Sequence, residues 1–282
     1  MSRGIQVWSE EAIAAYQREG RGRGKGQTYQ PWVRVIEMYS DGRSHEPYSH
    51  LTGRSHQLLS DAEFYAFLML EWAHDTADIR EQYPYDRELT QALAIDLGIK
   101  YPCYPGTHIP IVMTLDFLVN RVREGSEDAV GISVKTAEAL NDPEVVELLE
   151  LERATCQVMG MPFHLLVKER MPQQKIFNLE WIRDAQLDRD GAEPFPGFYE
   201  DHKARMLDDI VSGRPTSRLV DYCSDYDRRF SCRSGTGMRV ARMLLQSRSL
   251  TMDLNNKEPQ LARVDSFKLS ALPGRLRAVG EN

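Results

Sequence analysis

Long apolar runs and paired cysteines are both missing from this sequence. No apolar stretch approaches the roughly 20 residues that a membrane-spanning helix needs, and the N-terminal residues mix acids among the apolar positions, unlike a signal peptide. The 4 cysteines fall at no spacing typical of a metal site. We therefore expect a cytoplasmic protein that has no membrane segment, no zinc site and no disulfide.

The chain also lacks a net positive charge. Its formal charge is -7 at pH 7, which argues against a protein that coats nucleic acid indiscriminately. Any contact with DNA must therefore come from local clusters of basic residues. One cluster is the glycine-rich segment GRGRGKG, which contains Arg21, Arg23 and Lys25. It lacks the preceding strand and the closing Gly-Lys-Ser/Thr of an ATP-binding loop, so two alternatives remain: a solvated loop or a contact with DNA phosphates.

A length of 282 residues exceeds that of a usual single domain and favours two domains. Residues 186–197 are polar and rich in glycine and proline, as in a linker, so we expect domains 1–186 and 187–282. In the second domain, three helical patterns precede two extended segments, at 198–211, 216–230, 235–246, 249–254 and 261–269. This order predicts an α+β winged-helix domain whose hairpin turns at residues 255–257.

The first domain contains a predicted hairpin. Residues 111–119 form an apolar strand pattern that Asp116 interrupts, and residues 129–135 form a second one that ends on Lys135. Positions equally far from a hairpin turn pair with each other. With a turn near Ser126, Asp116 and Lys135 should therefore lie close together.

Other segments complete an α/β core around this hairpin. A helix is expected over 61–72 with Ser60 as its N-cap, and another over 142–159. Residues 162–167 predict a further strand. The alternation of strands and helices favours a sheet with helices packed on it.

An ionised carboxylate inside an apolar strand is costly unless it is paired or binds a metal. Cleavage of a phosphodiester needs a divalent metal held by carboxylates and a cation or base beside the attacking water. Asp116 and Lys135 suit this chemistry, and Ser133 points to the same face as Lys135 because side chains alternate along a strand. The arrangement is the D…(D/E)-x-K pattern of nucleases, with Ser133 in the place of the middle acid. The pattern alone leaves an alternative, a buried Asp–Lys ion pair.

Wider similarity supports the nuclease interpretation. From Glu10 to about Trp181, the sequence resembles the TnsA family of transposon endonucleases in the segments EGRGRGKG, YSHLTGRSHQLLSDAEF, ADIREQYP, MTLDFLV, SVK and LELER. This resemblance implies an α/β restriction-endonuclease-like core for residues 1–186, with a central mixed sheet flanked by helices.

The resemblance also implies the catalytic residues, which are Glu63, Asp116, Ser133 and Lys135. Glu63 and Asp116 would hold Mg²⁺, or Mn²⁺ in its place, with help from the backbone carbonyl of Val134. Ser133 matches a position that is neutral in the family, so a hydroxyl or the carbonyl stands where other nucleases use an acid.

Two acidic residues have alternative roles. Glu63 also fits a capping box in which it serves only the N-cap of the helix over 61–72. Glu152 matches an acid near the family's site, where it would support the ligands, but a charged residue on a helix is usually a solvated one.

The implied function is hydrolysis at the 5′ ends of a transposon, on the strands that are not transferred. Implied partners are transposon-end double-stranded DNA, a DDE-type transposase subunit (TnsB-like) and an AAA+ ATPase (TnsC-like). Two alternatives stay open. One is a freestanding restriction or repair nuclease, and the other is an inactive DNA-binding adaptor of the same fold, which Ser133 suggests.

Further residues are candidates for contacts with DNA or a partner. Arg80 and Gln82 end a strand pattern, where the alternative is a strand-end salt bridge. Arginines also recur between residues 228 and 248 without any acid among them. In this stretch Arg233, Arg239 and Arg242 are the predicted contacts with nucleic acid or with an acidic partner protein.

Overall fold

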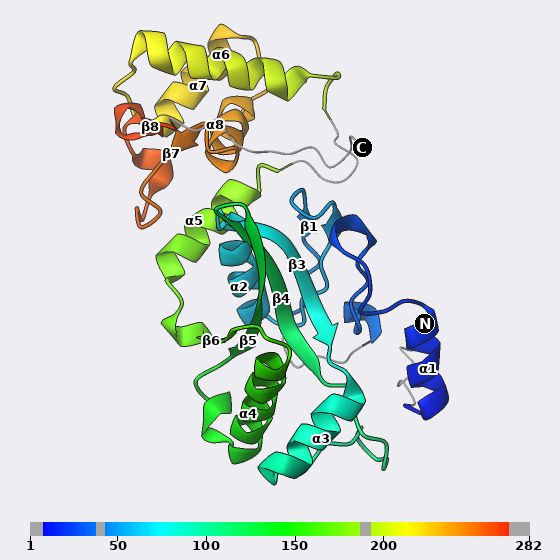
Figure 1. Ribbon diagram of the computed structural model, residues 1–282. Helices are drawn as coiled ribbons and strands as arrows, with labels where there is room; N and C mark the ends of the chain where they lie inside the picture. Colours follow the sequence, from blue (N-terminus) through cyan, green and yellow to red (C-terminus); the bar gives the residue numbers. More distant parts are fainter. Residues whose placement is uncertain (1–7, 38–42, 187–192, 271–282) are drawn as a thin grey trace. The chain divides into compact units, whose positions relative to one another are not determined.

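The computed structural model describes residues 8–37, 43–186 and 193–270 (Figure 1). The chain divides into two compact units, Met1–Met171 and Pro172–Asn282. Residues 187–192 of the predicted linker lie outside the described residues. None of the helices in the described ranges is long and apolar enough to cross a membrane.

The first unit is built around a four-stranded sheet in the order β3-β4-β5-β6. Neighbouring strands are antiparallel except for β5 and β6, which are parallel and therefore require a crossover. Helix α4 supplies this crossover and packs on β6, while α2 packs on β3 and β5. The expected mixed sheet flanked by helices is what the structure contains. Its strands are β3 (Thr76–Pro84), β4 (Thr114–Arg123), β5 (Ser126–Lys135) and β6 (Phe163–Val167).

The predicted hairpin is formed by β4 and β5, with Phe117 opposite Ile132. Its two-residue turn consists of Glu124 and Gly125, both with positive φ (51° and 83°), as a type I′ turn requires. The turn thus lies near Ser126 as predicted, but the second strand begins at Ser126 rather than at residue 129. The polar residues at the hairpin tip still pair between strands, because exposed strand ends tolerate polar side chains.

Two helices of the first unit, α2 and α4, begin at the predicted residues. At the start of α2, the Ser60 hydroxyl accepts a hydrogen bond from the Glu63 amide at 3.2 Å. Ser9 and Asp142 cap α1 and α4 in a similar way. The helices are α1 (Glu10–Arg18), α2 (Asp61–Trp72), α3 (Arg87–Leu97) and α4 (Pro143–Val158), and the short strands β1 (Tyr48–Ser49) and β2 (Arg54–Ser55) form a separate pair.

Strand β3 lies at an edge of the sheet, and segments from earlier in the chain contact its outer side. The Tyr29 hydroxyl donates to the carbonyl of Glu81 at 3.0 Å. Arg54 donates to the carbonyl of Ile79 at 2.8 Å. These contacts satisfy carbonyls that an edge strand would otherwise leave open to another chain.

The Glu81 side chain is fully buried, and charged neighbours surround its carboxylate. Arg54 donates to both oxygens at 2.8 and 2.6 Å, and His56 Nδ1 lies 2.8 Å from Oε2. Burial alone would raise the pKa of Glu81, but His56 and Arg54 together outweigh burial and hold that pKa below its ordinary value. This cluster fixes β3 just before Gln82.

From residue 193 to residue 270, the second unit contains three helices followed by a small antiparallel pair of strands, in the predicted order. The predicted hairpin with a turn at 255–257 is wrong, because the strands are only two residues long and two 3-10 helices, Pro259–Leu261 and Val264–Ser266, separate them. The winged-helix assignment therefore stays a prediction. The elements are α6 (Phe198–Gly213), α7 (Leu219–Arg229), α8 (Thr236–Gln246), β7 (Leu250–Thr251) and β8 (Lys268–Leu269).

Helix α5 (Gln173–Arg183) belongs to the second unit, whereas the sequence-based boundary after residue 186 assigns it to the first. Its packing partner within the unit is α8. The Asn178 side chain also donates to the carbonyls of Leu254 and Asn256, at 2.8 and 2.7 Å. These contacts with segments that follow much later in the chain explain why a local change in composition does not mark the division.

Replacing Glu81 with glutamine should lower the free energy of unfolding by about 3–5 kcal/mol, because Arg54 would be left buried without its counter-charge. Urea unfolding at pH 7 measures this cost. The depressed pKa of Glu81 means that its contribution is present above the unfolded pKa and is lost as the pH falls through the folded pKa. The difference between wild type and Glu81→Gln should therefore shrink in strong acid.

The control is Arg123→Ala, which removes an ion pair with Asp75 from a largely exposed position. It should cost less than about 1 kcal/mol. Similar costs for the two variants would contradict the structural role of the Glu81 cluster.

Candidate active site

Asp116 is the centre of a group of polar side chains from four elements. Lys135 Nζ lies 3.1 Å from Asp116 Oδ2, and the Val134 amide donates to the same oxygen at 2.6 Å. The predicted proximity of Asp116 and Lys135 is thus confirmed, and the hairpin register produces it. The full group is Glu63 from α2, Asp116 from β4, Ser133 and Lys135 from β5, and Glu152 from α4.

Glu63 serves the helix cap and also belongs to the site. Its Oε1 accepts from the Ser60 hydroxyl at 3.0 Å, and its Oε2 accepts from the Leu59 amide at 3.0 Å and from Gln82 Nε2 at 3.2 Å. The side chain is buried. Burial, followed by the negative charge of Asp116, raises the pKa of Glu63 to about 7. Glu63 therefore contacts the helix cap and also lies within the group around Asp116, and its role as a metal ligand stays a prediction.

Glu152 is buried rather than solvated, and the Ser133 hydroxyl donates to its carboxylate. Burial raises the pKa of Glu152 to about 7, with Asp116 adding to the rise and Lys135 opposing it. A carboxylate from α4 thus lies beside the position where other nucleases carry a strand acid. Helical spacing could have shown this, because Leu149, Glu152 and Cys156 share one buried face of α4.

Lys135 carries the positive charge of the group. Burial alone would lower the pKa of Lys135, but the charges of Asp116, Glu152 and Glu63 together outweigh burial and raise it. The side chain therefore keeps its proton at neutral pH.

The group has three carboxyl groups and one ammonium, so acidic groups outnumber basic ones by two. A divalent cation would balance this excess, and carboxylate oxygens are ligands that Mg²⁺ prefers. Within the part of the chain that the structure describes, no three His, Cys, Asp or Glu side chains are grouped to hold a metal. Glu63 and Asp116 carry oxygens of the kind that Mg²⁺ prefers, and metal binding by them stays a prediction.

Gln82 and Arg80 were predicted as DNA contacts, and the structure gives both of them partners inside the protein. Gln82 is 4% exposed and donates to Glu63. Arg80 donates to Asn120 Oδ1 at 2.6 Å and lies 3.7 Å from Asp78. Burial favours a role for Gln82 within the site, and Arg80 forms the strand salt bridge that the sequence left as its alternative.

The basic residues of the glycine-rich segment fall into two kinds. Arg21 is buried, donates to both carboxylate oxygens of Glu37 at 2.6 Å, and stacks on the ring of Tyr16. Arg23 and Lys25 are exposed, with Lys25 Nζ 3.4 Å from Glu127. Arg21 thus stabilises the fold, while contact with DNA stays a prediction for Arg23 and Lys25.

Two of the three candidate arginines in the second unit point inward. Arg242 Nε donates to the carbonyl of Trp181 at 2.5 Å, and Arg239 Nε donates to that of Ala185 at 3.2 Å. Helix α8 has no exposed residue, because α5, α6 and α7 all pack on it. These arginines cap the carbonyl end of α5. Their side chains therefore have partners inside the protein, and their contact with nucleic acid or a partner stays a prediction. Arg233 is exposed, and its contact stays a prediction.

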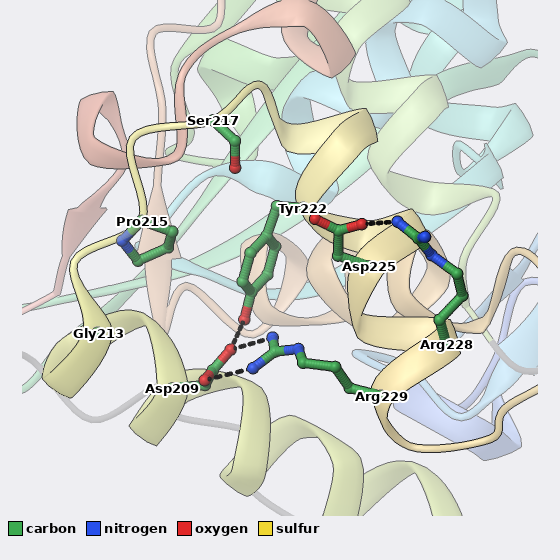
Figure 2. Close-up of a pocket in the computed structure, with 8 residues that line it drawn as sticks. All are labelled: Asp209, Gly213, Pro215, Ser217, Tyr222, Asp225, Arg228 and Arg229. Carbon is green, nitrogen blue, oxygen red and sulfur yellow. Dashed lines mark hydrogen bonds and ion pairs between the residues drawn. The ribbon is translucent and has the colours of Figure 1, made fainter.

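The second unit has a pocket of about 590 Å³ that is lined by residues of α6, of α7 and of the loop between them (Figure 2). Arg229 donates to both oxygens of Asp209, at 3.0 and 2.6 Å, and Tyr222 donates to the same carboxylate at 2.7 Å. Arg228 pairs with Asp225. The charged groups in this pocket therefore neutralise one another, and two more arginines of the predicted basic stretch are paired with acids.

A family model and a known protein are similar to this chain. The family model described as TnsA-like endonuclease N terminal matches residues 73–168, which include Asp116, Ser133 and Lys135. The chain is 36% identical over 244 residues to the Transposon Tn7 transposition protein TnsA of Escherichia coli. The matched region covers 86% of this chain and 86% of that protein.

Replacing Arg242 with alanine should lower the free energy of unfolding by about 1–2 kcal/mol, because the carbonyl end of α5 loses a charged donor. Arg233→Ala, the exposed control, should change it by less than about 0.5 kcal/mol. Thermal melts and DNA binding across a salt series should be measured together. A stable Arg242→Ala variant with a flatter salt slope would instead support the DNA contact.

Proposed function

Because the chain belongs to the TnsA family of transposition endonucleases, we propose that it cleaves DNA by metal-dependent hydrolysis at the Asp116 site. The observation that carries the proposal is the 3.1 Å contact between Lys135 Nζ and Asp116 Oδ2. Around this contact, buried carboxylates outnumber the ammonium. An inactive adaptor would have no need to keep such a costly group of charges.

Glu63 and Asp116 are the carboxylates that would hold Mg²⁺, with Mn²⁺ as a substitute. The Ser133 hydroxyl is occupied by Glu152, which favours the backbone carbonyl of Val134 as a further ligand. Bound Mg²⁺ would neutralise charge that develops on the phosphate and lower the pKa of the attacking water. Glu152 then acts through Ser133 and Lys135, by keeping both in place.

Lys135 is the group that would orient the attacking water. Its ammonium is held beside Asp116, and it retains its proton in this environment, which favours electrostatic activation over proton abstraction by the lysine itself. Attack of water on phosphorus with departure of the 3′ oxygen leaves a 5′-phosphate and a 3′-hydroxyl.

We further propose that the cut falls at the 5′ ends of a transposon, on the strands that are not transferred. Similarity along most of the chain to a transposition protein of a transposon supports this assignment. The partners would be transposon-end double-stranded DNA, a DDE-type transposase subunit and an AAA+ ATPase. Cleavage by the chain alone, without added partners, would instead indicate a freestanding nuclease.

Asp116→Ala and Lys135→Ala should each abolish Mg²⁺-dependent cleavage, because the first removes a ligand and the second removes the charge beside the water. Cleavage of labelled transposon-end DNA should be measured with both partner subunits present. Arg153→Ala, which changes an exposed ion pair on α4, should cleave like wild type. Wild-type rates for Asp116→Ala or Lys135→Ala would refute the site assignment.

Thermal melts of the same variants separate the site from a purely structural ion pair. A structural pair predicts a marked loss of melting temperature in each single variant, because one buried charge stays behind. The catalytic role predicts loss of cleavage with the fold retained.

Ser133→Ala should reduce cleavage by about 10- to 100-fold, as expected for a residue that supports the ligands. It should therefore be much less damaging than Asp116→Ala. Cleavage rates at saturating Mg²⁺ compare the two variants directly. Equal losses would show that the hydroxyl itself is a ligand and that the role assigned to the Val134 carbonyl is wrong.

A further inference from the structure

Gln82 has a backbone conformation that is unusual for a residue inside a strand. Its φ is 48°, in the left-handed region, yet it lies inside strand β3. The other non-glycine residues with positive φ in the described chain, such as Glu124 and Arg214, lie in turns or next to helix ends. A conformation of this kind costs about 1–3 kcal/mol and persists only where the surroundings impose it.

Contacts on both sides of Gln82 impose this conformation. Its carbonyl accepts from the Trp32 amide at 3.1 Å. The preceding residue, Glu81, is held by Arg54 and His56 in the buried cluster described above. The result is a strand that turns the Gln82 side chain toward Glu63.

The Gln82 amide bridges two elements of the site. Its Nε2 donates to Glu63 Oε2 at 3.2 Å, and its Oε1 accepts from the Thr114 hydroxyl at 3.2 Å. The reversed amide would place its oxygen against the Glu63 carboxylate, which has no proton to donate when ionised. The hydrogen bonds therefore define the orientation of the amide.

The Gln82 amide fills one of the acceptor positions of the Glu63 carboxylate. An ionised carboxylate has about four acceptor positions, two on each oxygen. Oε2 accepts from both the Leu59 amide and Gln82, so its positions are filled. Oε1 accepts from the Ser60 hydroxyl alone, which leaves one position open.

We propose that Gln82 is a positioning residue that makes Glu63 bind a divalent cation through Oε1 only. The inference rests on the proposed function, because it assumes that Glu63 is a metal ligand. Coordination through one carboxylate oxygen suits Mg²⁺, which demands a compact octahedral shell, whereas Ca²⁺ readily accepts both oxygens of a carboxylate. Gln82 therefore favours Mg²⁺ over Ca²⁺ at this site.

The test is isothermal titration of the full chain with Mg²⁺ and, separately, with Ca²⁺, in the absence of DNA. Gln82→Met keeps the length of the side chain but removes the amide. We expect the Mg²⁺ affinity of this variant to fall about 10- to 100-fold. Its Ca²⁺ affinity should stay unchanged or rise, so the preference for Mg²⁺ should drop at least about tenfold.

Two further variants keep the test decisive. Gln82→Gly also lacks the amide but adopts a positive φ without strain, so it carries the test if the methionine variant fails to fold. Gln91→Met makes the same replacement on α3, outside the site, and should bind both ions like wild type. A purely structural role for Gln82 would lower the melting temperature without changing the ratio of the two affinities.

The outcomes separate this inference from the proposed function. Wild-type affinities for both ions in Gln82→Met and Gln82→Gly would overturn the role of Gln82, while loss of binding in Asp116→Ala would still support the metal site. If wild type binds neither ion, or if Asp116→Ala binds both ions like wild type, the proposed site itself fails and the inference fails with it.

Discussion

Asp116 is attached to the neighbouring strand by two donors, and the arrangement of the whole site depends on that attachment. The Val134 amide and the Lys135 ammonium both reach Asp116 Oδ2, so one carboxylate oxygen is held by backbone and side chain together. The hairpin register brings these groups together, and the two-residue turn of Glu124 and Gly125 closes that hairpin. Helices then add Glu63 and Glu152 around a fixed centre.

Charge distinguishes this group of side chains from an ordinary buried core. Burial of carboxylates costs free energy unless donors or cations compensate. At Glu81, side chains of the protein itself compensate for the burial of the carboxylate, because His56 and Arg54 hold the pKa of Glu81 below its ordinary value. At Glu63 and Glu152 burial dominates and the pKa rises to about 7. The fold thus keeps a local excess of acidic groups, and a bound cation would stabilise their ionised forms.

In the second unit, the distribution of arginines along the sequence differs from their distribution on the surface. The stretch from residue 228 to 248 has no acidic residue, yet Arg229 pairs with Asp209 of another helix. Arg239 and Arg242 donate to carbonyls at the end of α5. An arginine side chain is long enough to reach a neighbouring element, so a run of basic residues does not by itself define a basic face.

Features that depend on neighbouring residues could be predicted from the sequence. The strand patterns around Asp116 and Lys135 predicted their proximity, because positions equally far from a hairpin turn must pair. Capping chemistry likewise predicted where α2 begins, since Ser60 and Glu63 lie within one turn of helix.

Tertiary structure decided the features that depend on distant segments. Three features depend on which helix or strand packs beside a residue. They are the hydrogen bond between Ser133 and Glu152, the burial of Gln82, and the hydrogen bond from Arg242 to the carbonyl of Trp181. Sequence patterns show which residue types recur along one element, but they do not show what covers that element. For this protein, local sequence patterns determined where Asp116 and Lys135 lie on their strands. Packing between helices and strands decided which other side chains surround these two residues.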